Sequence, residues 1–238
     1  DEYSLDFIDH DLDVPAFKIG SGEVENWSFL KNIASRGKPV ILSTGMYEIK
    51  HIKEAIKVIN DNGCNELAVL HCVTSYPAKP SIINLKVMDQ IKDFFPGPVG
   101  YSDHSKNTAI PLAAVALGAQ IIEKHITIDQ DIPNAHDWKV SCNPDNFKKF
   151  ISDIRDIESS IMVQKNKVSD IEKKSIEWAR KSITARVNIP KSCIIDNKML
   201  IMQRPGNGVT GSELNKVIGK KAKKNISKGC VIKLNDIS

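Results

Sequence analysis

One pattern repeats along the chain from Ala16 to about Thr127. Each repeat has a short, nearly continuous run of apolar and β-branched residues, then a turn rich in Gly, Ser or Asp, then a longer helical pattern. Such runs are typical of parallel strands covered on both faces, and strands that alternate with helices form βαβ units. The five runs are AFKIGSGE, KPVILSTGM, LAVLHCVTSYP, GPVGYSDH and AQIIEKHIT. The pattern therefore predicts an α/β fold with a parallel sheet.

Every one of these runs ends in polar, reactive residues. Ligand sites of parallel α/β folds lie beyond the carboxyl ends of the strands, and a doubly wound sheet gathers its ligand at one switch point. Functional groups at five consecutive strand ends therefore favour a (β/α)₈ TIM barrel. Because a complete barrel needs eight strands and about 250 residues, we expect only about the last five βα units here. The segment DEYSLDFIDHDLDVP before the first strand resembles the end of a helix and its turn.

The pattern changes after the fifth run. Asn143-Pro144-Asp145 is a typical start for a helix through FKKFISDIRDIESSIM, and a charged segment follows from Gln164 to Lys181. From Ser182 onward, short β-branched runs alternate with turns, which predicts a small β-rich module. We therefore predict a partial barrel domain at residues 1–163, a linker at 164–181 and a second domain at 182–238.

Composition limits the partners and the compartment. The net charge of the 238 residues is only +4, with both signs mixed through most of the chain, so we expect no nucleic-acid partner. The lysine-rich segment Lys216–Lys228 is interpreted as a solvated basic face. Five cysteines without close pairing predict free thiols and a reducing compartment. No apolar stretch reaches the roughly 20 residues that span a bilayer, so we expect a cytoplasmic protein without a membrane partner.

The run AQIIEKHIT alternates with a period of two, which places Glu123 and His125 on one face of the predicted strand. Lys124 then lies on the outer face, where we expect it to snorkel to solvent. His104 ends the preceding run. A single histidine at such a position is more often structural, but neighbouring strands lie about 5 Å apart, so two histidines at adjacent strand ends can reach one cation.

Two imidazoles with few carboxylates nearby leave coordination positions for water and substrate, which favours a catalytic divalent ion over a closed structural one. Asp103 or Asp137 could add a carboxylate ligand or a hydrogen bond to a ligand. The residue types leave the identity of the metal open. His71, inside an apolar run, is a weaker candidate and could equally be a hydrogen-bonded barrel residue.

One ammonium and several hydroxyls at neighbouring strand ends favour an anion site. They come from Lys18, Ser21, Ser43 and Ser102. Glycines beside them permit close approach of the backbone, although a tight βα turn alone would also explain IGSGE. In RPGNG, Arg204 precedes Pro205; the composition is that of a turn, and a functional arginine on a rigid arm is the alternative.

The motifs FKIGSGE, GKPVILSTGM, LHCVTSYP, GYSDH and IIEKHIT, followed by RPGNG and IGKKAKKNISKGCVIKLNDI, closely resemble the sialic acid synthase family over essentially the whole chain. The resemblance implies a (β/α)₈ barrel followed by a small antifreeze-like (SAF) β-clip domain, in a domain-swapped homodimer. It also implies condensation of phosphoenolpyruvate with an open-chain N-acetylated hexosamine, such as N-acetylmannosamine, to give a nine-carbon sialic-type acid and phosphate.

The resemblance also implies roles for single residues. His104 and His125 match metal ligands, typically for manganese, with magnesium or cobalt as alternatives, and the ion would polarise the sugar aldehyde. With Glu123 added from the strand pattern, the predicted catalytic residues are Lys18, Glu23, Tyr76 and Glu123. The predicted substrate-binding residues are Lys18, Ser21, Glu23, Ser43, Thr74, Tyr76, Ser102, Asp137 and Arg204, the last reaching the sugar site of the partner subunit.

Three departures from the family pattern bear on function. The first three barrel units and their substrate contacts are absent, so we do not expect residues 1–238 alone to be a competent catalyst. Thr74 stands where relatives often carry Asn or Ser, and Asn134-Ala135-His136 stands where they commonly read Gly-Pro. The alternatives are a carbohydrate-binding or regulatory non-catalytic fragment, or another metal-dependent barrel lyase or hydrolase. The sequence does not choose among N-acetylmannosamine, its 6-phosphate and a diamino-dideoxy sugar.

Overall fold

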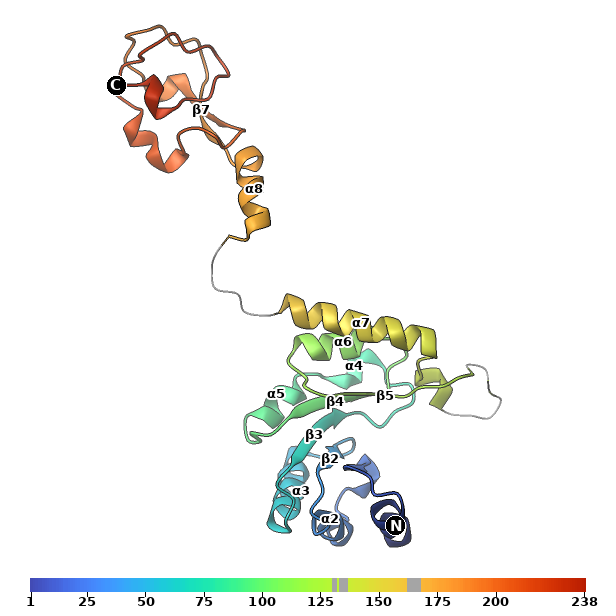
Figure 1. Cartoon of the computed structure of the whole chain (residues 1–238). Coiled ribbons are helices and arrows are strands. Elements are labelled where there is room, and N and C mark those ends of the chain that lie inside the picture. The colour runs from blue at the N-terminus through green and yellow to red at the C-terminus, as the bar shows by residue number, and fades with distance from the viewer. Residues whose placement is uncertain (130–131, 133–136, 162–167) are drawn as a thin grey trace. The chain divides into compact units, whose positions relative to one another are not determined.

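The computed structural model describes residues 1–129, 132, 137–161 and 168–238. The chain forms two compact units, Asp1–Met162 and Val163–Ser238 (Figure 1). The predicted domain boundary at 163–164 lies outside the described residues, as does the Asn134–His136 segment. No helix within the described ranges is long and apolar enough to cross a membrane. Each unit is described by itself.

A five-stranded parallel sheet forms the centre of the first unit. Its strands are β1 (Phe17–Ile19), β2 (Val40–Ser43), β3 (Leu67–Cys72), β4 (Val99–Asp103) and β5 (Ile122–Lys124), and their order in the sheet is their order in the chain. A doubly wound sheet would reverse direction at a switch point, whereas unbroken order is that of a (β/α) barrel. The predicted fold class is confirmed: the sheet is part of a barrel of this kind.

Helices connect the strands and cover one face of this sheet (Figure 1). They are α1 (Glu2–Asp6), η1 (Phe7–Asp11), η2 (Ser21–Glu23), α2 (Trp27–Ala34), α3 (Ile49–Asp61), α4 (Pro80–Ile83), α5 (Val87–Lys92), α6 (Ala109–Ala116), η3 (Asp137–Val140) and α7 (Pro144–Ser160). The predicted helix start at Asn143 is confirmed. Gly63 follows α3 with φ of +104°, a conformation that favours glycine. Asn143 begins α7, and its side chain accepts a hydrogen bond from the Asn146 amide.

The outward strand residues and the helices share the main hydrophobic core. Leu42, Val69, Val99 and Ile59 are all 0% exposed. Burying one such side chain stabilises the fold by about 1.5–3 kcal/mol. Alternate residues on the same strands face the other way, and those near the carboxyl ends of the strands are polar. In the strand register Cys72 pairs with Ser102 and Ser102 pairs with Glu123, so the inner face of the sheet carries a row of polar groups near the carboxyl ends of the strands.

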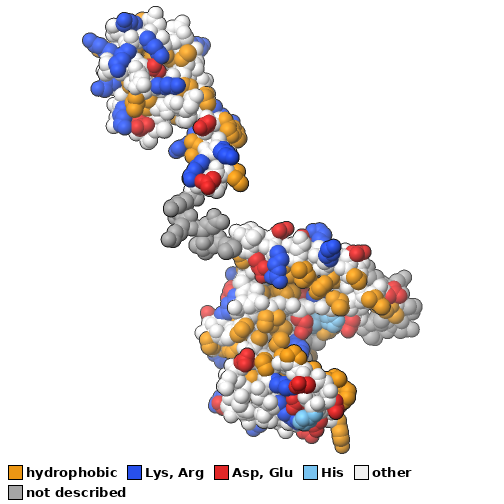
Figure 2. All heavy atoms as spheres, in the orientation of Figure 1, with side chains coloured by type: hydrophobic (Ala, Val, Ile, Leu, Met, Phe, Trp, Pro, Cys, Tyr) orange, Lys and Arg blue, Asp and Glu red, His pale blue; other side chains and the backbone are white. Residues whose placement is uncertain are grey.

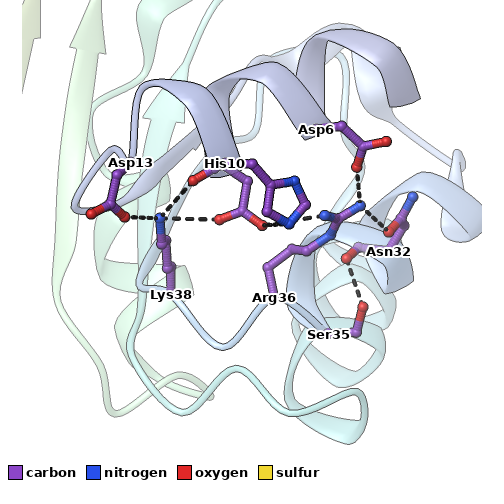
Figure 3. Close-up of polar contacts among 8 residues, drawn as sticks. Asp6, His10, Asp13, Asn32, Ser35, Arg36 and Lys38 are labelled. Atoms are coloured by element: carbon purple, nitrogen blue, oxygen red, sulfur yellow. Dashed lines mark hydrogen bonds and ion pairs between the residues drawn. The ribbon is translucent and has the colours of Figure 1, made fainter.

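An ion-pair cluster holds the N-terminal segment at the amino ends of the strands, opposite to the polar carboxyl ends (Figure 3). Arg36 lies 2.6 Å from Asp6 and 3.2 Å from Asp9, and Lys38 lies 3.0 Å from Asp9 and 2.8 Å from Asp13. Arg36 and Lys38 lie in the turn before β2. The cluster therefore holds α1 and η1 against the start of this strand and lies away from the polar strand ends.

The second unit contains α8 (Asp170–Ala179), β6 (Ser182–Ala185), η4 (Asn197–Met199), β7 (Leu200–Gln203), η5 (Gly211–Lys216) and η6 (Leu234–Asp236). The helix α8 lies inside the segment predicted as a linker. Among the described residues of this unit, only β6 and β7, which are antiparallel, form regular strands. Other short β-branched segments of this unit form isolated bridges instead, such as Ile189 with Ile226. Turns interrupt the pairing after one residue, so the alternating apolar residues fill a small core without forming a long ladder.

Basic side chains cover much of the visible surface of the second unit (Figure 2). The lysines at 216, 220, 221, 223, 224 and 228 are all exposed. Lys224 is paired with Asp236 at 2.6 Å, and Lys216 with Glu213 at 2.8 Å. This arrangement agrees with the interpretation of the lysine-rich segment as a solvated face.

Candidate active site at the strand ends

A lysine, a glutamate and a serine from three strands meet on the inner face of the first unit. The Nζ atom of Lys18, on β1, lies 3.4 Å from Oε2 of Glu123, on β5. The Ser102 hydroxyl, on β4, donates to Oε1 of the same carboxylate at 2.6 Å. Because β1 and β5 are the outermost strands of the sheet, an ion pair between them requires the sheet to curve. The curvature brings both ends of the sheet to one site.

Three aromatic rings lie beside this cluster. Tyr76 and His104 have ring centroids 4.1 Å apart, and their hydroxyl oxygen and Nε2 atoms are 3.0 Å apart. The His125 ring centroid lies 5.3 Å from that of His104 and 5.7 Å from that of Tyr76. The carbonyl oxygen of Val73 lies 2.8 Å from Nδ1 of His104. A carbonyl only accepts, so Nδ1 carries the proton, and Nε2 accepts from the tyrosine hydroxyl.

The electrostatics of His104 suit a neutral metal ligand. Burial is the main cause that lowers the pKa of His104, and the neighbouring His125 lowers it further. A neutral imidazole is the form that binds a metal ion. Asp137, on η3, places Oδ2 at 3.7 Å from Nδ1 of His125. The Asp137 carboxylate, the second one predicted for the metal site, therefore lies beside His125.

Hydroxyl groups line the neighbouring strand ends. The oxygens of Ser21 and Thr74 are 2.9 Å apart. A Cβ atom at Gly45 would clash with both of them, so glycine lets the backbone approach these two hydroxyls closely. Ser43 is 3% exposed, and its Oγ has no hydrogen-bond partner in the described part of the chain. A buried hydroxyl without a protein partner is costly, and it is a ready donor to a ligand oxygen.

Two expectations about single residues, for Asp103 and Lys124, end differently, and the roles expected for Glu23 and Arg204 stay predictions. Asp103 turns away from the histidines and pairs with Lys124 at 2.6 Å, so it does not serve as a ligand there. The expectation that Lys124 snorkels is wrong, because its side chain is 2% exposed and enclosed with this carboxylate. Glu23 accepts from Asn26 at 2.6 Å, and no hydrogen bond or ion pair within the described residues joins it to the strand-end cluster. Arg204 lies on the second unit, where its Nε donates to the Ala179 carbonyl at 3.0 Å.

Sequence reasoning missed Cys72 and left His71 open. The Cys72 sulfur lies 3.7 Å from Nδ1 of His104, and burial raises the pKa of its thiol. His71 faces the helices, where its Nε2 lies 2.6 Å from the Ile83 carbonyl, and burial lowers its pKa. The sequence LAVLHCVTSYP already distinguishes the inward Cys72 from the outward His71, since period-two alternation puts Cys72 and Thr74 on one face and His71 on the other.

Within the described ranges, no group of three or more His, Cys, Asp or Glu side chains is arranged to hold a metal ion. The histidine pair nevertheless fits part of such a site. The hydrogen bond from Nδ1 of His104 to the Val73 carbonyl is the arrangement that fixes the tautomer of metal-ligating histidines. Metal–nitrogen bonds of about 2.1 Å allow two imidazoles at this spacing to reach one ion, with water and substrate as further ligands.

Comparison with known proteins gives two matches along the chain. The sequence model of the NeuB family matches residues 1–166, and that of the SAF domain matches residues 180–238. The chain is 40% identical over 227 residues to the N,N'-diacetyllegionaminic acid synthase of Campylobacter jejuni, covering 94% of this chain and 68% of that protein. It is 33% identical over 226 residues to the human N-acetylneuraminate-9-phosphate synthase, covering 93% of this chain and 61% of that protein.

A solved structure agrees with these sequence matches. The N-acetylneuraminic acid synthetase of Leptospira borgpetersenii aligns with a TM-score of 0.63 and 35% identity, over 70% of this chain and 58% of that one. The chain spans about two thirds of the length of the curated relatives named above. The family match alone covers more than half of residues 1–238, and it agrees with the parallel half-barrel and the separate second unit. The chain therefore belongs to the NeuB family of sialic acid synthases and carries a SAF domain.

Proposed function

We propose that this chain provides the C-terminal part of the catalytic barrel, and the SAF domain, of a synthase that condenses phosphoenolpyruvate with an open-chain N-acetylated hexosamine. The product would be a nonulosonic acid together with inorganic phosphate. The observation that carries the proposal is the convergence of Lys18, Tyr76, His104, Glu123 and His125 at one end of the half-barrel. The names of the relatives support it, because they are synthases of legionaminic and neuraminic-type acids.

The reaction joins two carbon skeletons. The methylene carbon of phosphoenolpyruvate forms a bond to the aldehyde carbon of the sugar, whose oxygen takes up a proton and becomes a hydroxyl. Water adds to the carbon that bears the phosphate. The bond from this carbon to the phosphate oxygen then breaks, which leaves a ketone and releases inorganic phosphate. The protein's task is to align the two substrates and to stabilise charge on the carboxylate, the phosphate and the aldehyde oxygen.

The anionic substrate would lie against Lys18 and the hydroxyls. An ammonium and hydroxyl donors suit a carboxylate and a phosphate, and the buried Ser43 hydroxyl lacks a competing protein acceptor among the described residues. Glu123 forms an ion pair with Lys18 and accepts a hydrogen bond from Ser102. It would thereby orient these donors, and its second role would be to exchange a proton with water or with the aldehyde oxygen.

A divalent ion, manganese or alternatively magnesium or cobalt, would be held by His104 and His125 and would polarise the aldehyde when bound. The Tyr76 hydroxyl occupies the Nε2 lone pair of His104 in this structure. That lone pair cannot serve a hydrogen bond and a metal at once, so Tyr76 would release it on metal binding. The freed hydroxyl would then face the junction of the two substrates, while Asp137 would hold the second histidine or the sugar.

We further propose that Arg204 acts on the sugar site of a partner subunit in a domain-swapped homodimer. Its side chain is exposed on the second unit, directly before Pro205. The hydrogen bond from Nε to the Ala179 carbonyl fixes the base of the guanidinium at the end of α8. An exposed guanidinium held by a rigid turn suits recognition of a polar ligand on another surface. Glu23 and the Ser21–Thr74 hydroxyl pair would complete the sugar and phosphate contacts.

The direct test uses protein expressed from the complete gene. Phosphoenolpyruvate, Mn²⁺ and a panel of N-acetylhexosamines are added, and released phosphate is measured together with the mass of the sugar acid. The panel contains N-acetylmannosamine, its 6-phosphate and diacetamido-dideoxy hexoses. We expect phosphate release with one of these classes and none without sugar. Absence of release with every sugar, from protein that binds Mn²⁺, would refute the proposed reaction.

A further inference from the structure

A buried ion pair lies directly behind the two candidate metal ligands. Asp103 is the last residue of β4 and Lys124 the last residue of β5, and they are partners in the strand register. Their side chains are 0% and 2% exposed, and Nζ lies 2.6 Å from Oδ2. Each is followed in the chain by one of the two histidines. The pair therefore joins the two strands at the last position before His104 and His125.

The same two side chains also hold the turn on which His104 lies. The second carboxylate oxygen of Asp103, Oδ1, accepts from the amide of Ser105 at 3.0 Å. The Lys124 ammonium donates to the carbonyl oxygen of Ser105 at 2.8 Å. Asp103 and Ser105 flank His104, so its backbone is fixed on both sides. The His104 ring is held in addition by the carbonyl of Val73, at 2.8 Å from Nδ1.

Stability alone does not explain such a pair. Desolvating two charges costs about as much as their attraction returns, and replacing a buried pair by uncharged residues of similar volume is often neutral or stabilising. What the pair supplies is a defined geometry, because each charge binds its opposite on the neighbouring strand and also Ser105, in the turn after β4. Around it the main chain of Cys142 donates to the His125 carbonyl at 2.8 Å, which fixes the far side of β5.

We propose that Asp103 and Lys124 are a positioning pair, which sets the spacing of His104 and His125 for a shared divalent cation. The inference rests on the proposed function and deepens it. Asp103 and Lys124, on the outer face of the sheet, would set the geometry of the metal site on its inner face. Removing partners that orient metal ligands typically costs about 10- to 100-fold in metal affinity. We expect a loss of this size when the pair is removed, with little change in stability.

The experiment measures Mn²⁺ affinity by electron paramagnetic resonance of the free ion, and the thermal unfolding midpoint, on protein from the complete gene. The double variant Asp103→Asn, Lys124→Met removes both charges. The matched control is Asp9→Asn, Lys38→Met, which removes an ion pair at the other end of the strands (Figure 3). We expect Mn²⁺ affinity to fall about 10- to 100-fold in the first and to stay within about 2-fold of wild type in the second.

A second variant covers the case in which the double variant does not fold. Asp103→Glu keeps both charges but adds a methylene between the carboxylate and the main chain, so it displaces the contact with Ser105. We expect about a 10-fold loss of Mn²⁺ affinity. Wild-type affinity in Asp103→Glu, and in the double variant if it folds, would overturn the positioning role. Failure of the wild-type protein to bind Mn²⁺ through His104 and His125 would instead refute the metal site of the proposed function.

Discussion

The Tyr76 hydroxyl donates to the one nitrogen of His104 that could bind a metal ion. The two atoms are 3.0 Å apart, and the other ring nitrogen is held by the Val73 carbonyl at 2.8 Å. The tyrosine ring also stacks on the imidazole with a centroid distance of 4.1 Å. The two residues therefore couple the candidate metal site to the space in which the substrates would meet.

This contact predicts opposite effects of Tyr76→Phe on metal binding and on turnover. The variant keeps the stacking and removes the competing hydrogen bond, which is worth about 0.5–1.5 kcal/mol. We expect Mn²⁺ to bind as tightly as in wild type or up to about 10-fold more tightly, while kcat falls. Isothermal titration and steady-state kinetics on the same preparation measure both. Weaker Mn²⁺ binding in the variant would mean that the tyrosine supports the metal site and does not compete with it.

The histidine pair predicts loss of metal binding when either ring is removed. His104→Ala and His125→Ala should each reduce Mn²⁺ binding by at least about 100-fold, because two protein ligands leave no redundancy. The control is His10→Ala, in which an exposed histidine of the N-terminal ion-pair cluster is removed (Figure 3). Equilibrium dialysis against Mn²⁺ measures the affinity. Unchanged binding in one of the first two variants would assign that histidine to a structural role.

The buried Ser43 hydroxyl predicts a variant that gains stability and loses substrate affinity. It lacks a hydrogen-bond partner among the described residues, so Ser43→Ala removes an unsatisfied group and should raise the free energy of unfolding by up to about 1 kcal/mol. We expect KM for phosphoenolpyruvate to rise about 10-fold, the cost of one hydrogen bond to a charged group.

The neighbouring Thr44 provides a matched control for Ser43. Its hydroxyl donates to the Leu70 carbonyl at 3.0 Å and is buried. Thr44→Val should lower the free energy of unfolding by about 1 kcal/mol and leave KM for phosphoenolpyruvate unchanged. Urea unfolding and initial rates of phosphate release measure the two quantities. The assignment of Ser43 to the anion site would be contradicted by equal KM values in the two variants.

The proposed role of Arg204 predicts complementation between chains. Arg204→Ala and His125→Ala chains should each be inactive alone, because one lacks the arginine and the other lacks a metal ligand. Refolded together in equal amounts, they should regain about a quarter of wild-type activity, since about half of the dimers contain both chains and each mixed dimer has one intact site of two. Activity is measured as phosphate release. If mixing restores nothing while each chain still dimerises, Arg204 does not act on the partner subunit.

The N-terminal ion-pair cluster predicts a pH dependence of stability that is independent of the reaction. The ion pairs with Lys38 and then Arg36 lower the pKa of Asp9. A carboxyl whose folded pKa is below its unfolded value contributes stability above the unfolded pKa, and this contribution is lost as the pH falls through the folded pKa. We expect Asp9→Asn to lose less stability than wild type between about pH 5 and pH 2. Urea midpoints across this range measure the difference, and parallel curves would contradict it.

Local patterns in the sequence predicted much of the fold. The apolar runs gave the five strands, and capping residues such as Asn143 gave the helix starts, because these features depend on neighbours within a few residues. Period-two alternation also predicted that Glu123 and His125 share a face. In the second unit the same alternation overestimated the regular strands, because whether a short run pairs along its length depends on the turns around it.

Contacts across the sheet could not be predicted in this way. Alternation placed Lys124 on the outer face, but its burial depends on Asp103 of the adjacent strand and on the helices that enclose both. The row formed by Cys72, Ser102 and Glu123 depends on the register between strands. This register cannot be read from a single sequence.

The sequence by itself determined the α/β class, the two-part organisation and the residue types available at the strand ends, because each follows from local periodicity and turn chemistry. The tertiary structure alone decided which of these groups meet. The contact between Lys18 and Glu123 exists because the sheet curves until its first and fifth strands face each other. The turn that carries His104 is hydrogen-bonded to charges buried behind it, and this contact joins residues of two strands that lie 21 positions apart in the chain.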